Sequence, residues 1–158
     1  MVTTAKGGTL ADYVPFYFAP RSPMLYSIHG GFVEGYSEGQ DPIVHLEASV
    51  EAVVRTGLAF AFTDGHAEMA VSDCFDDLTE LSEKVDWEVM RSKYWNDTVD
   101  QPDRKRKRQA EFLVHHFAPW TLVHRIGVRT VAMRQEVEAM LAVSAHQPNV
   151  EVRVDWYY

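Results

Sequence analysis

RKRKRQAEFLVH, from Arg104 to His115, combines five consecutive cations, one carboxylate and a short apolar run within twelve residues. The alternation in its second half predicts a β-strand. The two predicted faces are Ala110, Phe112 and Val114 on one side, and Glu111, Leu113 and His115 on the other. A carboxylate between two apolar neighbours on a strand must be solvated, paired or functional. From the residues alone, Glu111 could still be an ordinary exposed residue that follows a solvated charge run.

The composition is typical of a single globular domain. The chain has 158 residues, 46% of them hydrophobic, so we expect one domain with one core over residues 1–158. The net charge of −8 argues against binding nucleic acid through overall charge and leaves a local patch, such as Arg104–Arg108. Cys74 is the single cysteine, and the sequence shows neither a signal-peptide pattern nor a long apolar run. We therefore expect a cytoplasmic protein without membrane association.

Periodicity predicts short strands alternating with short helices. The expected strands cover residues 13–18, 42–47, 58–62, 110–115, 122–131 and 150–154, and the expected helices cover residues 23–29, 49–56, 75–84, 86–94 and 133–146. Residues 1–11 are small and polar, which predicts a flexible leader. Pro15 places the first strand at a sheet edge, because proline lacks a ladder donor. Residues 63–66 are predicted to turn out of the third strand, leaving His66 at its end.

Several kinds of site are absent from the sequence. The histidines show no pair at ligand spacing apart from the adjacent His115 and His116, so we expect no metal site. GxGxxG, Walker A and GxSxG patterns do not occur. What remains is Glu111, a basic and aromatic surface from Lys93 to Arg108, and Arg21. Arg21 stands just before the helix start at Ser22-Pro23, where an anion is favoured, although pairing with a carboxylate is an equal alternative. An anion site with a carboxylate beside a basic surface suits chemistry on a nucleotide or a nucleic acid.

Several segments are very similar to one known family. They are YVPFYFAPRSPMLY at 13–26, DPIVHL at 41–46, YWND at 94–97, PDRKRKRQAEFLV at 102–114 and the terminal tyrosines. Together they resemble DarT, the DNA ADP-ribosyltransferase toxins of bacterial toxin–antitoxin pairs. The resemblance implies an α+β, ADP-ribosyltransferase-like fold with a split, mainly antiparallel β core and surrounding helices. It also implies NAD as co-substrate, single-stranded DNA as acceptor, typically thymine as the modified base, and a DarG-like macrodomain antitoxin as partner.

The resemblance also implies site residues. Glu111 matches the family's catalytic glutamate in RQAEFLV, and Arg21 matches its catalytic arginine in APRSPM. The chemistry is consistent, because a carboxylate on the ribose 2′-hydroxyl stabilises the positive charge that develops when nicotinamide leaves. The guanidinium of Arg21 stays protonated, so it is expected to orient the base or stabilise its developing negative charge.

Further contacts follow by the same matching. The implied NAD-binding residues are Arg21, Tyr17 and Phe18. The implied DNA-binding residues are His66, Tyr94 and Trp95 around an unstacked base, and Arg104, Arg106 and Arg108 along the backbone. Of the two tryptophans in this region, Trp87 is expected to pack in the core rather than Trp95.

The chain departs from the family at its start. Family members carry further residues before the YVPFYF strand, including a His-x-Thr segment that holds the NAD ribose, whereas Met1 stands twelve residues before Tyr13. We therefore expect either a form shortened at the N-terminus or a start codon assigned too late. A shortened form would have a weaker hold on NAD and one flank of the core uncovered. Two alternatives stay open. One is a catalytically impaired remnant that binds single-stranded nucleic acid with steep salt dependence, and the other is a transferase that modifies RNA or protein.

Overall fold

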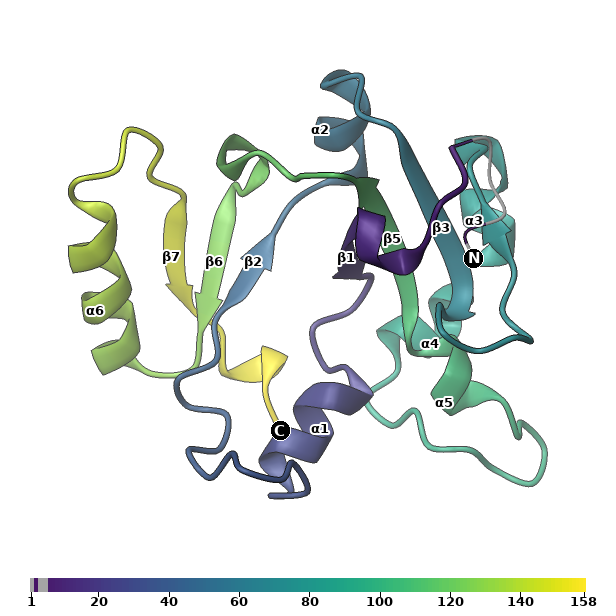
Figure 1. The fold of residues 1–158 in the computed structure, drawn as a ribbon. Coiled ribbons are helices and arrows are strands. Elements are labelled where there is room, and N and C mark those ends of the chain that lie inside the picture. Colours follow the sequence, from purple (N-terminus) through teal and green to yellow (C-terminus); the bar gives the residue numbers. More distant parts are fainter. Residues whose placement is uncertain (1, 3–5) are drawn as a thin grey trace. The chain divides into compact units, whose positions relative to one another are not determined.

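The computed structural model describes residue 2 and residues 6–158, which form two compact units (Figure 1). Each unit combines two separate parts of the chain. Unit 1 contains the described residues up to Ser22 together with Gly57–Ala118, and unit 2 contains Pro23–Thr56 and Pro119–Tyr158. Because the units interleave along the sequence, neither is a contiguous domain. The single ADP-ribosyltransferase-like domain over residues 1–158 stays a prediction.

Unit 1 is built on a four-stranded antiparallel sheet in the order β1-β5-β3-β4. The strands are β1 (Tyr13–Tyr17), β5 (Ala110–His115), β3 (Phe60–His66) and β4 (Cys74–Phe75). The strand expected over 110–115 is confirmed, and five of its six residues are buried. β1 lies at the edge of the sheet, as Pro15 predicted. The central position of β5 explains its burial on both faces.

The helices of unit 1 are short. They are η1 (Leu10–Asp12), η2 (Leu78–Glu80), α3 (Leu81–Lys84), α4 (Trp87–Arg91) and α5 (Arg104–Lys107). Asp86 accepts a hydrogen bond from the Val89 amide at 3.1 Å and so begins α4. The helix predicted over 75–84 is wrong at its start, because Phe75 pairs with Phe62 in the sheet. Asp77 then caps η2 by accepting from the Thr79 amide at 2.9 Å.

The beginning of the chain covers part of one sheet face in unit 1. Val2 is 4% exposed and lies in a cluster with Tyr13, Ala61 and Leu113, against which Leu10 packs. The Val2 amide also donates to the Gly8 carbonyl at 3.0 Å. The flexible leader predicted over residues 1–11 therefore does not hold for Val2 and Leu10, whose apolar side chains are packed. Residues 1 and 3–5 lie outside the described part of the chain.

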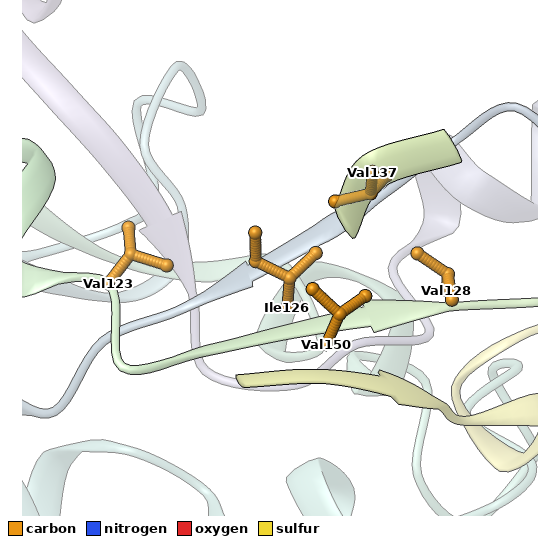
Figure 2. Close-up of a cluster of buried hydrophobic side chains, with 5 residues drawn as sticks. All are labelled: Val123, Ile126, Val128, Val137 and Val150. Carbon is orange, nitrogen blue, oxygen red and sulfur yellow. The ribbon is translucent and has the colours of Figure 1, made fainter. Parts of the chain in front are cut away.

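Unit 2 has a three-stranded mixed sheet in the order β2-β6-β7. β2 (His45–Glu47) is antiparallel to β6 (Arg125–Val128), which is parallel to β7 (Asn149–Val152). Parallel neighbours need a crossover, and α6 (Val131–Leu141) supplies it. Figure 2 shows Val137 of this helix lying over a buried cluster made with Val123, Ile126, Val128 and Val150. The antiparallel and mixed sheets with short helices confirm the predicted α+β class.

The remaining elements of unit 2 are short helices. They are α1 (Pro23–His29), α2 (Val50–Arg55), η3 (Trp120–Leu122) and η4 (Val154–Trp156). Ser49 caps α2 by accepting from the Ala52 amide at 3.1 Å. The helix expected from residue 133 begins earlier, because Thr130 accepts from the Met133 amide at 3.1 Å. No helix among the described residues is long and apolar enough to cross a membrane.

The end of the chain is part of the packing of unit 2. The Tyr157 hydroxyl lies 2.6 Å from the Ile43 carbonyl oxygen and 3.1 Å from that of Gly127, and it can donate to either. Burial raises the pKa of Tyr157 to about 12. A Cβ at Gly127 would lie 2.3 Å from the ring of Trp156, so this ring needs a glycine beneath it. The tyrosines of the terminal motif thus connect segments that are distant in sequence.

The valine cluster of unit 2 provides a test of stability. Val128 is 0% exposed, whereas Val143 is 94% exposed. Val128→Ala is expected to lower the free energy of unfolding by about 2 kcal/mol, because it removes buried methyl groups and leaves a cavity. Val143→Ala should leave it nearly unchanged. Urea unfolding of both variants makes the comparison, and equal losses would contradict the described packing.

Candidate active site

Glu111 is a buried carboxylate on the central strand β5. The residue is 8% exposed, and none of the ion pairs among residues 2 and 6–158 includes it. Burial raises the pKa of its carboxyl group, although the Ala67 amide, 3.4 Å from Oε2, and the nearby His66 act in the opposite direction. A carboxylate that is desolvated without a fixed counter-charge is a candidate for chemistry.

Tyr17 and His66 border the same carboxylate. Tyr17 stands directly opposite Glu111 in the β1–β5 ladder, so the two side chains share a sheet face. Burial raises the pKa of the Tyr17 hydroxyl, and the negative charges of Glu111 and Glu68 raise it further. His66 ends β3, as expected from the sequence, and its Nδ1 accepts from the Glu68 amide at 3.4 Å. Two of the predicted binding residues therefore lie beside Glu111.

Phe18, the other predicted NAD contact, lies elsewhere. Its ring packs edge-on against Trp87, with centroids 5.5 Å apart, and against Phe112, with centroids 6.3 Å apart. Phe112 follows Glu111 on β5 and so points to the opposite face. The structure thus places the Phe18 side chain in the packing of the sheet and not beside Glu111.

The strand opposite Glu111 contains an insertion. Phe62 pairs with Phe112 and His66 pairs with Ala110, so residues 63–65 of β3 face Glu111 alone. The turn predicted over residues 63–66 is therefore wrong, because the strand continues through a bulge. Sequence reasoning missed this feature, although a glycine within a strand pattern is a known signal for a bulge.

Arg21 is held near the same end of the β1–β5 ladder as Glu111. It follows Tyr17 by four residues, and its carbonyl oxygen accepts from Nε of Arg108 at 3.0 Å. Arg108 precedes Glu111 by three residues. The Arg21 backbone is thus fixed against the segment that leads into the Glu111 strand. Both predicted catalytic residues belong to unit 1.

Arg108 is itself buried, with 3% exposure. Besides the Arg21 carbonyl, its guanidinium donates to three carbonyls at the end of α4 and beyond it. These belong to Val89 at 2.7 Å, Met90 at 2.6 Å and Ser92 at 3.2 Å. A guanidinium in this position satisfies carbonyls that the end of a helix leaves open. The prediction that Arg108 contacts the DNA backbone is therefore wrong.

The other two arginines of the predicted DNA-backbone set also make contacts within unit 1. Arg106 has an 11% exposed side chain and forms ion pairs with Asp64 at 3.1 Å and Asp103 at 2.7 Å. Its guanidinium holds the pKa of Asp103 below the usual range. Arg104 donates to the Tyr94 carbonyl at 2.7 Å and to the Ser92 hydroxyl at 2.9 Å. The planar fork of Arg106 is committed within unit 1, which contradicts its predicted DNA-backbone role. The DNA-backbone role of Arg104, which is partly exposed, stays a prediction.

The aromatic pair Tyr94-Trp95 is divided between surface and core. Trp95 is 5% exposed, so the expectation that Trp87 is the buried tryptophan of the two is wrong, and Trp95 offers no surface for stacking. Tyr94 is 73% exposed, and Nζ of Lys93 lies 5.4 Å from its ring centroid. Asp97 explains the end of the YWND motif, because it accepts from the Lys105 amide at 2.8 Å at the start of α5. Of the predicted acceptor residues in this motif, Tyr94 alone is exposed.

In the described part of the chain, no group of three or more His, Cys, Asp or Glu residues is arranged to hold a metal ion.

Comparisons with known proteins show which family the chain is similar to. The chain matches, over residues 1–158, the family described as DarT, ssDNA thymidine ADP-ribosyltransferase. A DNA ADP-ribosyl transferase from Thermus sp. (strain 2.9) is 46% identical over 159 residues, covering 99% of this chain and 74% of the relative. Solved structures of Thermus sp. 2.9 DarT in complex with NAD+ and with ADP-ribosylated ssDNA each give a TM-score of 0.93 at 45% identity. These two matches cover 99% of this chain, and 78% and 74% of those chains, respectively.

The raised pKa of Glu111 predicts an effect on stability. A folded-state pKa above the ordinary 4.5 means that the folded chain binds the proton more tightly than the unfolded chain does. The ionised carboxylate therefore opposes folding above the raised pKa. Glu111→Gln should raise the free energy of unfolding at pH 7, by an amount that shrinks as the pH falls and vanishes below about 4.5. Chemical unfolding at several pH values measures the difference.

The exposed Glu136 provides the control, since Glu136→Gln removes a carboxylate that folding does not bury. It should leave the pH dependence of stability unchanged. A Glu111→Gln variant that is less stable than the unaltered chain at pH 7 would contradict the burial argument.

Proposed function

The chain belongs to the DarT family of single-stranded DNA thymidine ADP-ribosyltransferases, and we propose that Glu111 and Arg21 catalyse its transfer reaction. The enzyme uses NAD as co-substrate and moves ADP-ribose to the base of a thymidine in single-stranded DNA. The observation that carries the assignment of residues is Glu111, a buried carboxylate without an ion pair among the described residues, on the strand beside the anchored Arg21.

The reaction exchanges one bond at the ribose for another. The bond between C1′ and nicotinamide breaks, positive charge develops on the ribose, and a ring nitrogen of thymine forms the new bond to C1′ while its proton is released. A carboxylate that accepts a hydrogen bond from the ribose 2′-hydroxyl stabilises this charge, most strongly where water is excluded. Glu111 meets this need, because its carboxyl group is desolvated and forms no ion pair with any of the described residues.

Arg21 suits the acceptor side of the reaction. Its guanidinium cannot act as a base, since it stays protonated, but it can stabilise the negative charge that develops on thymine. Its backbone carbonyl is held by the buried Arg108, which restricts where the guanidinium can reach. We assign Tyr17 and His66 to the same reaction site, because Tyr17 pairs with Glu111 across the sheet and His66 lies close enough to affect its carboxyl group.

The surface around Tyr94 suits the DNA strand. An exposed aromatic ring with an ammonium group close by favours stacking of a base next to a phosphate. Because Arg106 and Arg108 are committed internally, we assign the phosphate contacts to the exposed Lys93 and Lys105, together with the partly exposed Arg104.

The biological setting extends this proposal. We propose that the enzyme acts as a toxin in the cytoplasm and is countered by a DarG-like macrodomain antitoxin that removes the modification. The family resemblance supports the toxin and its partner. The single cysteine supports a reducing compartment, because the chain cannot form an internal disulfide.

Loss of the Glu111 carboxylate tests the proposed function. Glu111→Ala is expected to lower the rate of ADP-ribosylation about a hundredfold or more, because it removes a preorganised group that stabilises the transition state. The measurement is the NAD-dependent mobility shift of a thymine-containing single strand. A strand without thymine and the exposed-carboxylate variant Glu136→Ala are the matched controls.

An undiminished shift with Glu111→Ala would overturn the assignment of Glu111. If the unaltered chain binds single strands with steep salt dependence but releases no nicotinamide from NAD, the binding-remnant alternative is correct instead. Release of nicotinamide that requires RNA or protein would select the remaining alternative.

The acceptor surface gives a separate prediction. Tyr94→Ala should weaken binding of single-stranded DNA by about 1–3 kcal/mol, the usual contribution of one stacked base. Lys105→Ala should reduce the slope of log affinity against log salt by about 0.7, as expected for one lost phosphate contact. Fluorescence anisotropy at several salt concentrations measures both effects, with Lys84→Ala as the control. A slope that Lys105→Ala leaves unchanged would exclude its phosphate contact.

A further inference from the structure

The bulge in β3 lies directly opposite Glu111. Residues 63–65 occupy the space that one residue would fill in a regular ladder. Bulges re-aim side chains and interrupt pairing, and they are frequent beside active sites. We propose that Thr63 and Arg106 are positioning residues that hold this bulge and thereby aim the Glu111 carboxylate. This inference rests on the catalytic role proposed for Glu111.

Thr63 replaces a ladder contact that the bulge removes. The residue is 3% exposed, and its hydroxyl accepts a hydrogen bond from the Glu111 amide at 3.0 Å. The same hydroxyl donates to the Gly65 carbonyl at 2.7 Å. One side chain therefore satisfies the backbone of Glu111 and closes the bulge on itself. Without this hydroxyl, the buried Glu111 amide would lose its acceptor.

Arg106 fixes the bulge from the other side. It donates to the Asp64 carboxylate and to the Ser72 hydroxyl, each at 3.1 Å, and it also binds Asp103. Its side chain lies directly over Gly65, because a Cβ built there would come within 2.2 Å of Nη1 and 2.9 Å of Cγ. Glycine at position 65 thus makes room for the arginine. The middle residue of the basic run is thereby connected to the backbone opposite Glu111.

These contacts separate two possible roles of Arg106. A phosphate-binding arginine would have its guanidinium in solvent and would affect DNA affinity and its salt dependence. The guanidinium of Arg106 is instead held by two carboxylates and a hydroxyl, with an 11% exposed side chain. Its loss should therefore change the rate of the chemical step and leave DNA binding unchanged.

The experiment uses Thr63→Val, Thr63→Ser and Arg106→Gln in the full chain. Thr63→Val keeps the shape of the side chain and removes the hydroxyl, so kcat should fall about tenfold while KM for NAD changes less than about twofold. Thr63→Ser keeps the hydroxyl, so its kcat should stay close to that of the unaltered chain. Arg106→Gln should lower kcat by about tenfold or more, with unchanged DNA affinity and salt slope.

A second comparison places Thr63→Val in a Glu111→Gln background. If Thr63 acts through Glu111, the residual rate of Glu111→Gln should fall no further when the hydroxyl is removed. A full additional tenfold loss would overturn the inference. So would a Thr63→Val variant with normal kcat, or an Arg106→Gln variant with normal kcat and a smaller salt slope.

Failure of the inference is distinguishable from failure of the proposed function. A fully active Glu111→Gln enzyme would refute the role of Glu111 itself. An inactive Glu111→Gln enzyme together with an unaffected Thr63→Val enzyme would refute the positioning role alone. If Arg106→Gln does not fold, the Thr63 variants decide, because Val and Ser differ from Thr by little volume.

Discussion

Unit 1 depends on the burial of β5 on both faces, with an ionisable residue inside it. A buried carboxylate normally requires a cation or several donors, because desolvation disfavours its charged form. Glu111 has one long hydrogen bond from the Ala67 amide, and no ion pair among the described residues. Its raised pKa is the electrostatic result. The fold thus keeps a desolvated carboxylate at a cost in stability, and such groups are common at sites where the charge interacts with a substrate.

The basic run that precedes this strand has a structural use. A series of arginines in an acidic chain suggests a surface for nucleic acid, yet Arg106 and Arg108 point into unit 1. There, Arg108 collects backbone carbonyls, including that of Arg21, and Arg106 closes over Gly65. Guanidinium groups suit this task, because each offers several donors in a fixed plane. The same run therefore organises the surroundings of both proposed catalytic residues.

Local patterns predicted much of this architecture. The strand over residues 110–115 and its two faces follow from alternation, the edge position of β1 follows from Pro15, and α2 follows from the helical periodicity of residues 49–56. The predicted catalytic residues were found by resemblance, and the structure then placed both in unit 1. Such predictions succeed where neighbouring residues carry the information.

The errors concern partners that are distant in sequence. Arg106 is buried because Asp64, far away in the chain, lies opposite it. Thr63 and Gly65 predicted a turn because their individual preferences favour one, whereas pairing with β5 extends the strand through them. Burial of Trp95 rather than Trp87 likewise depends on the packing around it. A single sequence does not specify which of several possible partners a side chain meets.

The most direct test of the central claim is a pH titration of the carbon-13 NMR shift of the Glu111 carboxyl carbon. It is recorded in the free protein and with the NAD analogue carba-NAD bound. The account predicts a midpoint above the ordinary 4.5 in the free protein, because the carboxyl group is desolvated. It predicts a lower midpoint with the analogue bound, since a hydrogen bond from the ribose hydroxyl favours the charged form. A midpoint at or below 4.5 in the free protein, or one that the analogue leaves unchanged, would contradict it.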